Sequence, residues 1–182
     1  MIAYVTSIGE PTTELCIWAL ERNGYDVVIF RSDNSLWQKL SDIYETAVAD
    51  FNRVDADVIV HRNLHPERRT GSQKDQHIWC WQLLVFDWYK QDVGHSMAFI
   101  NKAALPSLRA NIDRFKLSLR PETEVSRIPE LHNPRRMITY DHQIMGIHGF
   151  GINDLSDVKR LKEARNQMDN YDFELVERLN AL

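Results

Sequence analysis

A short apolar run, Val58-Ile59-Val60, is followed at once by three side chains that could bind a ligand, His61-Arg62-Asn63. A run of β-branched residues bounded by polar residues predicts a buried strand rather than a helix. In an open α/β sheet, ligands bind outside the carboxyl ends of the strands. A guanidinium can pair two phosphate oxygens in a fixed fork. We therefore expect Arg62 and its two neighbours to lie in a ligand pocket at the edge of a sheet.

Other residues with chemical potential have competing structural explanations. Glu122 and Glu124 fall in the first turn of an expected helix, where the helix dipole alone favours acids. His148 lies in a glycine-rich segment, where it could simply bond to the backbone. Asp55 and Asp57 precede the apolar run, at the start of the expected strand, which is the wrong end for a ligand. We expect a structural rather than a catalytic role for this acidic pair.

Several common site motifs are absent from the sequence. There is no Gly-x-Gly-x-x-Gly after the first strand, no Gly-x-x-x-x-Gly-Lys-Ser/Thr loop and no Gly-x-Ser-x-Gly elbow. The two cysteines, Cys16 and Cys80, show no zinc-ligand spacing and stand among apolar neighbours. Dinucleotide oxidoreductases and P-loop enzymes are therefore disfavoured, and the cysteines are expected to be buried free thiols in a reducing compartment.

Length and composition indicate an ordinary globular chain. Its 182 residues fit one domain with a proper core, and 43% hydrophobic with 26% charged residues is typical of soluble proteins. The net charge of −4 argues against a general binder of nucleic acid or membrane surfaces. No apolar run approaches the roughly 18 residues that span a bilayer. We expect a soluble, cytoplasmic protein without a membrane span.

The first third of the chain alternates between expected strands and helices. Strands are predicted at Ile2-Ala3-Tyr4-Val5, at Val27-Val28-Ile29-Phe30 and at residues 58–60. The helices between them start near Thr12 and Ser35, and the second is expected to end near Asp50. Strict alternation of this kind predicts an α/β fold with a doubly wound sheet and right-handed crossovers.

The later elements follow a polar loop at residues 65–76. The aromatic stretch 78–89 is interpreted as core packing, with a substrate platform as the alternative. Strands are expected at 83–86, 94–100 and 136–140, helices after Asn101 and from Pro121, a glycine-rich loop at 146–151, and two amphipathic helices within 154–182.

Taken in order, these segments resemble the nucleotide-sugar fold of GT-A glycosyltransferases, especially the broad family two. In that family the first strand ends in a loop with an acid, where this chain has Thr6 and Glu10. The second strand ends in an acid that touches the nucleotide base, which Asp33 matches. A later strand ends in Asp-x-Asp, which holds a divalent metal against the diphosphate, and here His61-Arg62-Asn63 takes that place. The resemblance implies that the donor is bound by Thr6, Glu10, Asp33, Arg62 and Asn63.

The second half of the chain is similar to the acceptor side of the same family. The segment from Gly94 to Leu105, which includes His95, looks like the strand and helix that border the acceptor pocket. Glu122 and Glu124 take the place of a Glu-Asp pair whose second acid is typically the general base. His148 falls where many members place a metal-binding histidine. The resemblance thus implies a catalytic Glu124, a metal ligand in His148, and Glu122 and His95 on the acceptor side.

The fold implied by the resemblance is a single-domain, GT-A-like (Rossmann-like) mixed α/β sheet flanked by helices. Residues 1–150 would form the catalytic domain, and 151–182 a C-terminal helical extension packed on it. The implied activity moves a sugar from a nucleotide-sugar donor to an acceptor hydroxyl. The acceptor is left open between a saccharide, a small molecule, a protein and a modified nucleic acid.

A divalent metal, manganese or magnesium, is also implied, but the replaced Asp-x-Asp leaves alternatives open. Arg62 could substitute for the metal at the diphosphate. Alternatively, Asn63 and His148 could hold a weakly bound metal, with His61 or His65 joining them. Two further hypotheses are a non-catalytic α/β module that binds a nucleotide or a partner, and a nuclease or phosphohydrolase.

Overall fold

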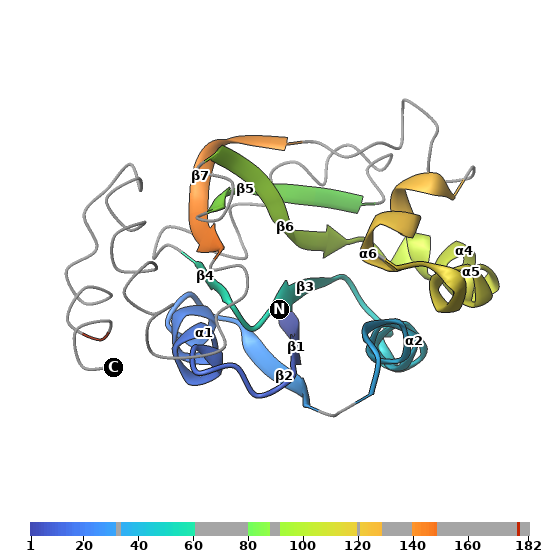
Figure 1. The fold of residues 1–182 in the computed structure, drawn as a ribbon, viewed down its shortest axis with the longest axis horizontal. Coiled ribbons are helices and arrows are strands. Elements are labelled where there is room, and N and C mark those ends of the chain that lie inside the picture. Colours follow the sequence, from blue (N-terminus) through green and yellow to red (C-terminus); the bar gives the residue numbers. More distant parts are fainter. Residues whose placement is uncertain are drawn as a thin grey trace.

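The structure is a computed structural model, and it describes residues 1–31, 34–60, 80–87, 92–119, 121–128 and 140–148 together with Arg178. Within these residues seven strands form one sheet in the order β2-β1-β3-β6-β5-β7-β4 (Figure 1). The strands are β1 (Ile2–Ser7), β2 (Asp26–Arg31), β3 (Phe51–Asp55), β4 (Val58–Val60), β5 (Cys80–Asp87), β6 (Asp92–Ile100) and β7 (Tyr140–His148).

The sheet is mixed, with a parallel part and an antiparallel part. Strand β1 lies between β2 and β3 and runs parallel to both. Strand β6 is antiparallel to β3 and β5, whereas β7 is parallel to β5 and antiparallel to β4. The carboxyl ends of β1, β2 and β3 therefore meet at one edge, and the carboxyl end of β7 pairs with the amino end of β4 through Val58 and His148.

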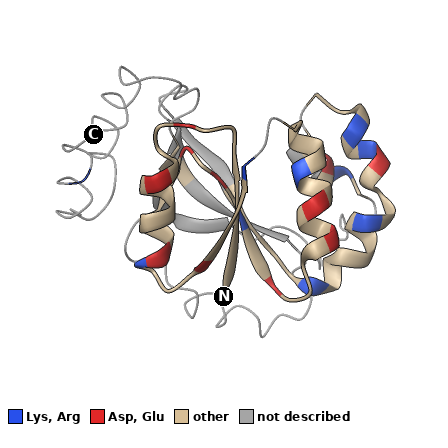
Figure 2. Ribbon diagram, turned by 90° about the horizontal axis from the view of Figure 1, so that it is seen from below, with Lys and Arg blue, Asp and Glu red and all other residues tan. Residues whose placement is uncertain are grey.

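Helices cover both faces of the sheet, which makes three layers (Figure 2). In Figure 1, α1 lies on one side of the sheet, and α2, α4, α5 and α6 lie together on the other. The helices are α1 (Thr13–Glu21), α2 (Leu36–Thr46), α4 (Leu105–Ala110), α5 (Ile112–Leu117) and α6 (Pro121–Glu124), with single 3-10 turns η2 (Lys102–Ala104) and η3 (Val125–Arg127). The mixed α/β sheet flanked by helices confirms the predicted fold class.

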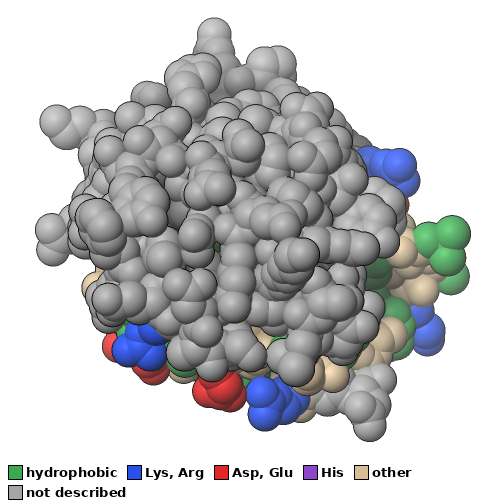
Figure 3. Space-filling view, turned by 60° about the vertical axis from the view of Figure 1, so that its left-hand side comes forward, with side chains coloured by type: hydrophobic (Ala, Val, Ile, Leu, Met, Phe, Trp, Pro, Cys, Tyr) green, Lys and Arg blue, Asp and Glu red, His purple; other side chains and the backbone are tan. Residues whose placement is uncertain are grey.

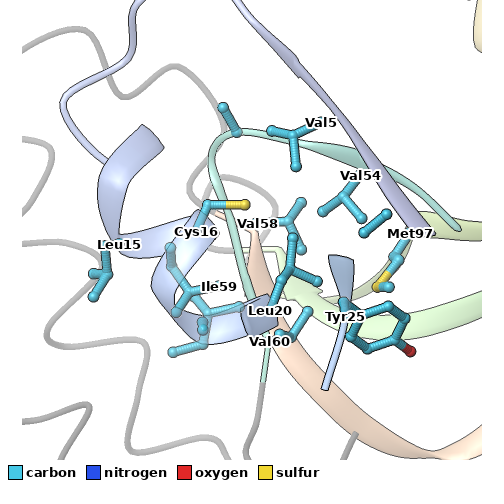
Figure 4. Close-up of a cluster of buried hydrophobic side chains, with 14 of the residues drawn as sticks. Val5, Leu15, Cys16, Leu20, Tyr25, Val54, Val58, Ile59, Val60 and Met97 are labelled. Atoms are coloured by element: carbon cyan, nitrogen blue, oxygen red, sulfur yellow. The ribbon is translucent and has the colours of Figure 1, made fainter. Parts of the chain in front are cut away.

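Each face of the sheet has its own hydrophobic core, because successive strand residues point to opposite faces. Val5 joins the cluster under α1, in which Cys16 and Leu20 project from the helix towards the sheet (Figure 4). Its neighbour Tyr4 joins the cluster under α2, α4 and α5. Strands β1 and β3 are thereby buried on both faces, whereas the edge strand β2 is half-buried or exposed along its length.

The sequence predicts one strand that leads into His61, but this segment contains two strands, β3 and β4. Strand β3 ends at Asp55, and β4 starts at Val58 after a turn. Asp55 therefore lies at the carboxyl end of a strand, and its predicted place at the start of one is wrong. Pattern reading missed β3 because two of its five residues, Asn52 and Arg53, are polar yet buried.

Most other elements are confirmed, with shifted boundaries. The helix expected to reach Asp50 ends at Thr46, because Ala47 is extended and Arg109 donates to the carbonyl oxygens of Tyr44 and Ala47 at 2.8 Å each. The helix expected after Asn101 is divided into η2, α4 and α5, with a break at Asn111 between the last two.

The predicted glycine-rich loop is wrong at its start, since residues 146–148 belong to β7. A Cβ atom on Gly146 would approach the carbonyl oxygen of Ile59 to 2.9 Å, so glycine is needed there for close strand packing. Of the strand predicted at 136–140, only Tyr140 is described, and it begins β7.

The predicted C-terminal extension lies outside the described residues except for Arg178, whose guanidinium lies 4.1 Å from the centre of the Trp18 ring on α1. Among the described residues, no helix combines the length and the apolar character that crossing a bilayer would require. On the face in Figure 3, the described basic and acidic side chains alternate along the lower rim and form no patch of one sign.

Candidate functional site

The carboxyl ends of β1 and β3 form the centre of the candidate site. Thr6 near the end of β1 stands beside Asp55 at the end of β3 in the parallel register. The Thr6 hydroxyl donates to Asp55 Oδ1 at 2.7 Å, and Arg53 Nη1 lies 3.6 Å from the same oxygen. The Arg53 side chain is only 6% exposed, so the carboxylate of Asp55 has a buried guanidinium as its partner.

The loop that leaves β1 is built around the carboxylate of Glu10. Glu10 Oε2 accepts hydrogen bonds from the hydroxyl of Ser7 at 2.7 Å and from the amide of Ile8 at 2.9 Å. The amide of Gly9 donates to Ser7 Oγ at 2.9 Å, and its φ of 96° is a left-handed value that glycine adopts without strain. Glu10 thus fixes the shape of the loop at the edge where a ligand of the sheet would bind.

The turn between β3 and β4 is fixed through its backbone. The amide of Ala56 donates to the carbonyl of Thr6 at 3.0 Å, and the hydroxyl of Thr12 donates to the carbonyl of Ala56 at 3.0 Å. The thiol of Cys16 donates to the carbonyl of Asp55 at 3.8 Å. These contacts tie the Asp55-Ala56-Asp57 turn to β1 and to α1, which orients both carboxylates.

His148 reaches the same turn from the end of β7. Its Nε2 lies 3.3 Å from Asp57 Oδ2, and both side chains are largely buried, at 13% and 14% exposure. Burial raises the pKa of Asp57, and the hydrogen bond and charge of His148 oppose this increase. The charges of Asp55 and Glu10 also act to raise the pKa of Asp57.

The same acids act on the buried thiol of Cys16. Burial raises its pKa well above the ordinary value, and Asp57, Asp55 and Glu10 raise it further in that order. Cys16 is therefore a protonated donor that supports the turn, and not a nucleophile.

The donor atoms of this cluster fit a hard divalent cation in part. Among the described residues, no group of three or more histidine, cysteine or acidic side chains stands close enough to hold a metal alone. Asp57 and His148 could offer an oxygen and a nitrogen, with Asp55 adjacent. Mg²⁺ is commonly held by one or two carboxylates together with substrate phosphates and water. A cation here would thus need oxygens from a bound ligand.

A buried lysine also reaches this edge. Lys39 of α2 is 3% exposed, and its Nζ donates to the carbonyl oxygen of Ser7 at 2.7 Å. Sequence reasoning missed it, although a signal exists. Lys39 stands one residue before Leu40 and four before Ile43, so it falls on the inward face of an amphipathic helix.

Glu124 lies elsewhere in the molecule. Its carboxylate accepts a hydrogen bond from Ser118 at 3.1 Å and pairs with Arg127 at 2.7 Å. In Figure 1, α6 lies beside α4 and α5, away from the end of β7. The structure therefore does not bring Glu124 together with His148.

The predicted site residues other than Glu124 divide into those near the carboxyl edge of β1 and β3 and those whose side chains or whole residues lie outside the described set. Thr6 contacts Asp55 and His148 contacts Asp57, the two acids for which the sequence predicted a structural role, while Glu10 bonds within the loop that leaves β1. Glu122 lies in α6 and His95 in β6, and their side chains are outside the described set, like the whole of Asp33, His61, Arg62, Asn63 and His65.

No family model matches the chain, and no curated protein matches it significantly. Among solved structures, a glycosyltransferase involved in the glycosylation of the major capsid of PBCV-1 is similar over 90% of this chain and 98% of that one, at 14% identity and a TM-score of 0.58. A structure described as a "putative glucose-1-phosphate thymidylyltransferase from Bacillus anthracis in complex with a sucrose" is similar over 94% of this chain and 78% of that one, at 14% identity and a TM-score of 0.50. The chain therefore shares the α/β fold of these two proteins, in agreement with the fold that the resemblance implies.

Proposed function

We propose that the protein is a glycosyltransferase that binds a nucleotide-sugar donor at the carboxyl edge of β1 and β3. The observation that carries this proposal is the Asp55-Ala56-Asp57 turn, which follows a strand directly and has His148 3.3 Å from Asp57. The GT-A resemblance includes an Asp-x-Asp after a strand and a histidine near it. The fold shared with a glycosyltransferase supports the same reading.

In this proposal Asp55 and Asp57 take the Asp-x-Asp role for which His61-Arg62-Asn63 is the sequence-based candidate. Arg62 and Asn63 follow β4 and stay proposals as donor-binding residues, as does Asp33 after β2. Thr6 and Glu10 support the donor indirectly, because their side chains hold Asp55 and the loop after β1.

A divalent cation, manganese or magnesium, fits this set of residues once the diphosphate of a donor is present. Asp57 and His148 would hold it together with oxygens of the diphosphate, since carboxylate and phosphate oxygens suit Mn²⁺ and Mg²⁺. When bound, such a cation neutralises negative charge on a departing diphosphate.

The transfer itself makes one bond and breaks one. The acceptor hydroxyl oxygen bonds to the anomeric carbon, the bond from that carbon to the donor phosphate oxygen breaks, and the nucleoside diphosphate leaves. The hydroxyl proton passes to a base. The role of Glu124 as that base stays a prediction, and its pairing with Arg127 favours a structural role instead.

Calorimetry with UDP-, GDP- and dTDP-sugars, with and without manganese, tests donor binding. We expect manganese to strengthen the binding of one of these donors to the wild type. In the double variant Asp55→Asn with Asp57→Asn, manganese should no longer strengthen binding. The control is Asp113→Asn, which changes an exposed acid on α5. Absence of binding by every donor would refute the proposal.

A turnover assay separates transfer from simple binding. Release of nucleoside diphosphate with an acceptor or with water supports the glycosyltransferase. Tight nucleotide binding without any release would instead indicate the non-catalytic nucleotide-binding module, and consumption of a nucleoside triphosphate with release of pyrophosphate would indicate a nucleotidyltransferase.

A further inference from the structure

Lys39 connects α2, the helix after β2, to the end of β1 at the candidate donor edge. It lies in the first turn of α2, the helix that follows β2, and it reaches the carbonyl of Ser7, the last residue of β1. The donor proposal places the nucleotide at the ends of these two strands. A single side chain therefore connects both sides of the proposed nucleotide site.

This ammonium group is buried and needs polar partners. Lys39 is 3% exposed, and removing a charged ammonium from water is unfavourable until its partners offset that penalty. An apolar residue here would take this donor away from the carbonyl oxygen of the buried Ser7. The bond from Lys39 to Ser7 therefore connects α2 to the start of the loop that leaves β1.

That bond acts on the residue that organises the loop. Ser7 donates its hydroxyl to Glu10, accepts the amide proton of Gly9, and lies 3.0 Å from the hydroxyl of Thr13. Fixing the carbonyl of Ser7 therefore fixes the peptide plane from which the Ser7–Glu10 loop departs. Ile8, whose side chain is 69% exposed, is presented outward by this loop.

We propose that Lys39 is a positioning residue that holds the Ser7–Glu10 loop in the shape that recognises the nucleoside part of the donor. The proposal rests on the donor site proposed above. Lys39 acts through Ser7 and is not expected to touch the reacting atoms, so its loss should weaken nucleotide affinity while leaving the turnover of bound donor largely unchanged.

The first experiment measures nucleotide affinity by calorimetry with UDP, GDP and dTDP in the presence of manganese. Lys39→Met removes the bond and keeps the length of the side chain, and we expect the Kd to rise about tenfold. Lys39→Arg retains a donor and should recover part of the affinity. The value of kcat/KM in Lys39→Met should fall because KM rises, while kcat stays largely unchanged.

The matched control is Arg109→Met. Arg109 stabilises the other end of α2 by donating to the carbonyls of Tyr44 and Ala47, so its loss destabilises the same helix away from the donor edge. We expect this variant to lower the melting temperature without changing the Kd. An equal loss of affinity in Arg109→Met, or unchanged affinity in Lys39→Met, would overturn the proposal.

A second measurement does not depend on the donor. Amide hydrogen exchange at Ile8 and Gly9 should be about tenfold faster in Lys39→Met than in the wild type, because both amides are bonded within the loop. Unchanged exchange overturns the positioning role even if no nucleotide binds. If the wild type binds no nucleotide, the proposed function is refuted. Faster exchange in Lys39→Met would in that case still support the positioning of the loop by Lys39.

Discussion

Asp57 and Glu124 are both largely buried acids, but their surroundings differ. Asp57 follows a strand at the carboxyl edge of the sheet, faces His148, and has a pKa raised by burial and by two neighbouring acids. Glu124 lies on a four-residue helix, where Arg127 and Ser118 bond its carboxylate. Burial and the neighbouring carboxylates disfavour the charged form of Asp57, whereas Glu124 has a permanently charged partner in Arg127.

This difference separates a candidate binding site from a structural contact. A buried carboxylate beside other carboxylates is costly until a cation joins it, which is typical of sites arranged for a ligand. A carboxylate already paired with a guanidinium gains little from another partner. We therefore expect substitutions at Asp57 to affect ligand binding and substitutions at Glu124 to affect stability.

The largest effect is expected from Asp57→Asn. Loss of a direct ligand should weaken manganese-dependent nucleotide binding by at least about a hundredfold, since even changes around metal ligands cost 10–100-fold. The amide oxygen can still accept from His148, and the buried charge is gone. The metal-free variant should therefore unfold at the same urea concentration as the wild type, or at a higher one. Clear destabilisation of the metal-free protein would instead make Asp57 a structural residue.

A smaller effect is expected from Gly146→Ala, which probes the packing that brings His148 to Asp57. The added methyl group would lie 2.9 Å from the carbonyl oxygen of Ile59 and must push β4 away from β7. We expect the free energy of unfolding to fall by about 1–3 kcal/mol and metal-dependent binding to weaken. Urea unfolding and calorimetry measure the two effects.

Gly24→Ala is the control for that variant. A Cβ on Gly24 meets no atom within 4 Å, but its φ of 81° disfavours alanine. Its loss of stability should leave the binding of manganese and nucleotide unchanged. Equal binding losses in the two variants would show that the site responds to general destabilisation and not to the approach of β4 and β7.

Glu124→Gln should have a modest effect on stability. Arg127 is 66% exposed, so solvent screens the ion pair, and we expect a loss of about 1 kcal/mol in the free energy of unfolding. Sugar transfer per folded molecule should be retained. If transfer disappears while donor affinity and stability persist, Glu124 is the general base that the resemblance implies.

The smallest effect is expected in the pH dependence of stability without metal. Because the folded pKa of Asp57 is raised, the folded state binds more protons than the unfolded state between the ordinary and the raised pKa. Stability should therefore be greatest below that window and fall as pH rises through it. Urea unfolding across this range should show the decline in the wild type and a weaker one in Asp57→Asn. The affinity for manganese should change in the opposite direction and rise with pH.

Much of the fold could be predicted from hydrophobic pattern alone. The strands at β1, β2 and β6 and the starts of α1 and α2 follow from apolar runs and helix-start residues close to their predicted places. Strand β3 could not be predicted in this way, because its buried Arg53 and Asn52 resemble surface residues in the sequence. That single omission moved the expected ligand edge from Asp55 to His61.

The candidate site was accessible to sequence reasoning only in part. The resemblance to GT-A glycosyltransferases selected Thr6 and His148, which contact the Asp55-Ala56-Asp57 turn, and Glu10 in the loop after β1, but also Glu124, which lies elsewhere. Lys39 escaped notice because a lysine within a helix reads as solvated, and its burial depends on the path of β1 beneath α2.

The sequence by itself determined the alternation of strands and helices and the identity of the acids and histidines, because hydrophobic period and side-chain chemistry are local properties. Only the tertiary structure decided which carboxylate faces which partner. The pairing of β4 with β7 brings His148, 91 positions later in the chain, beside Asp57. Such long-range pairing depends on the register of strands and the burial of whole faces, and no local pattern encodes it.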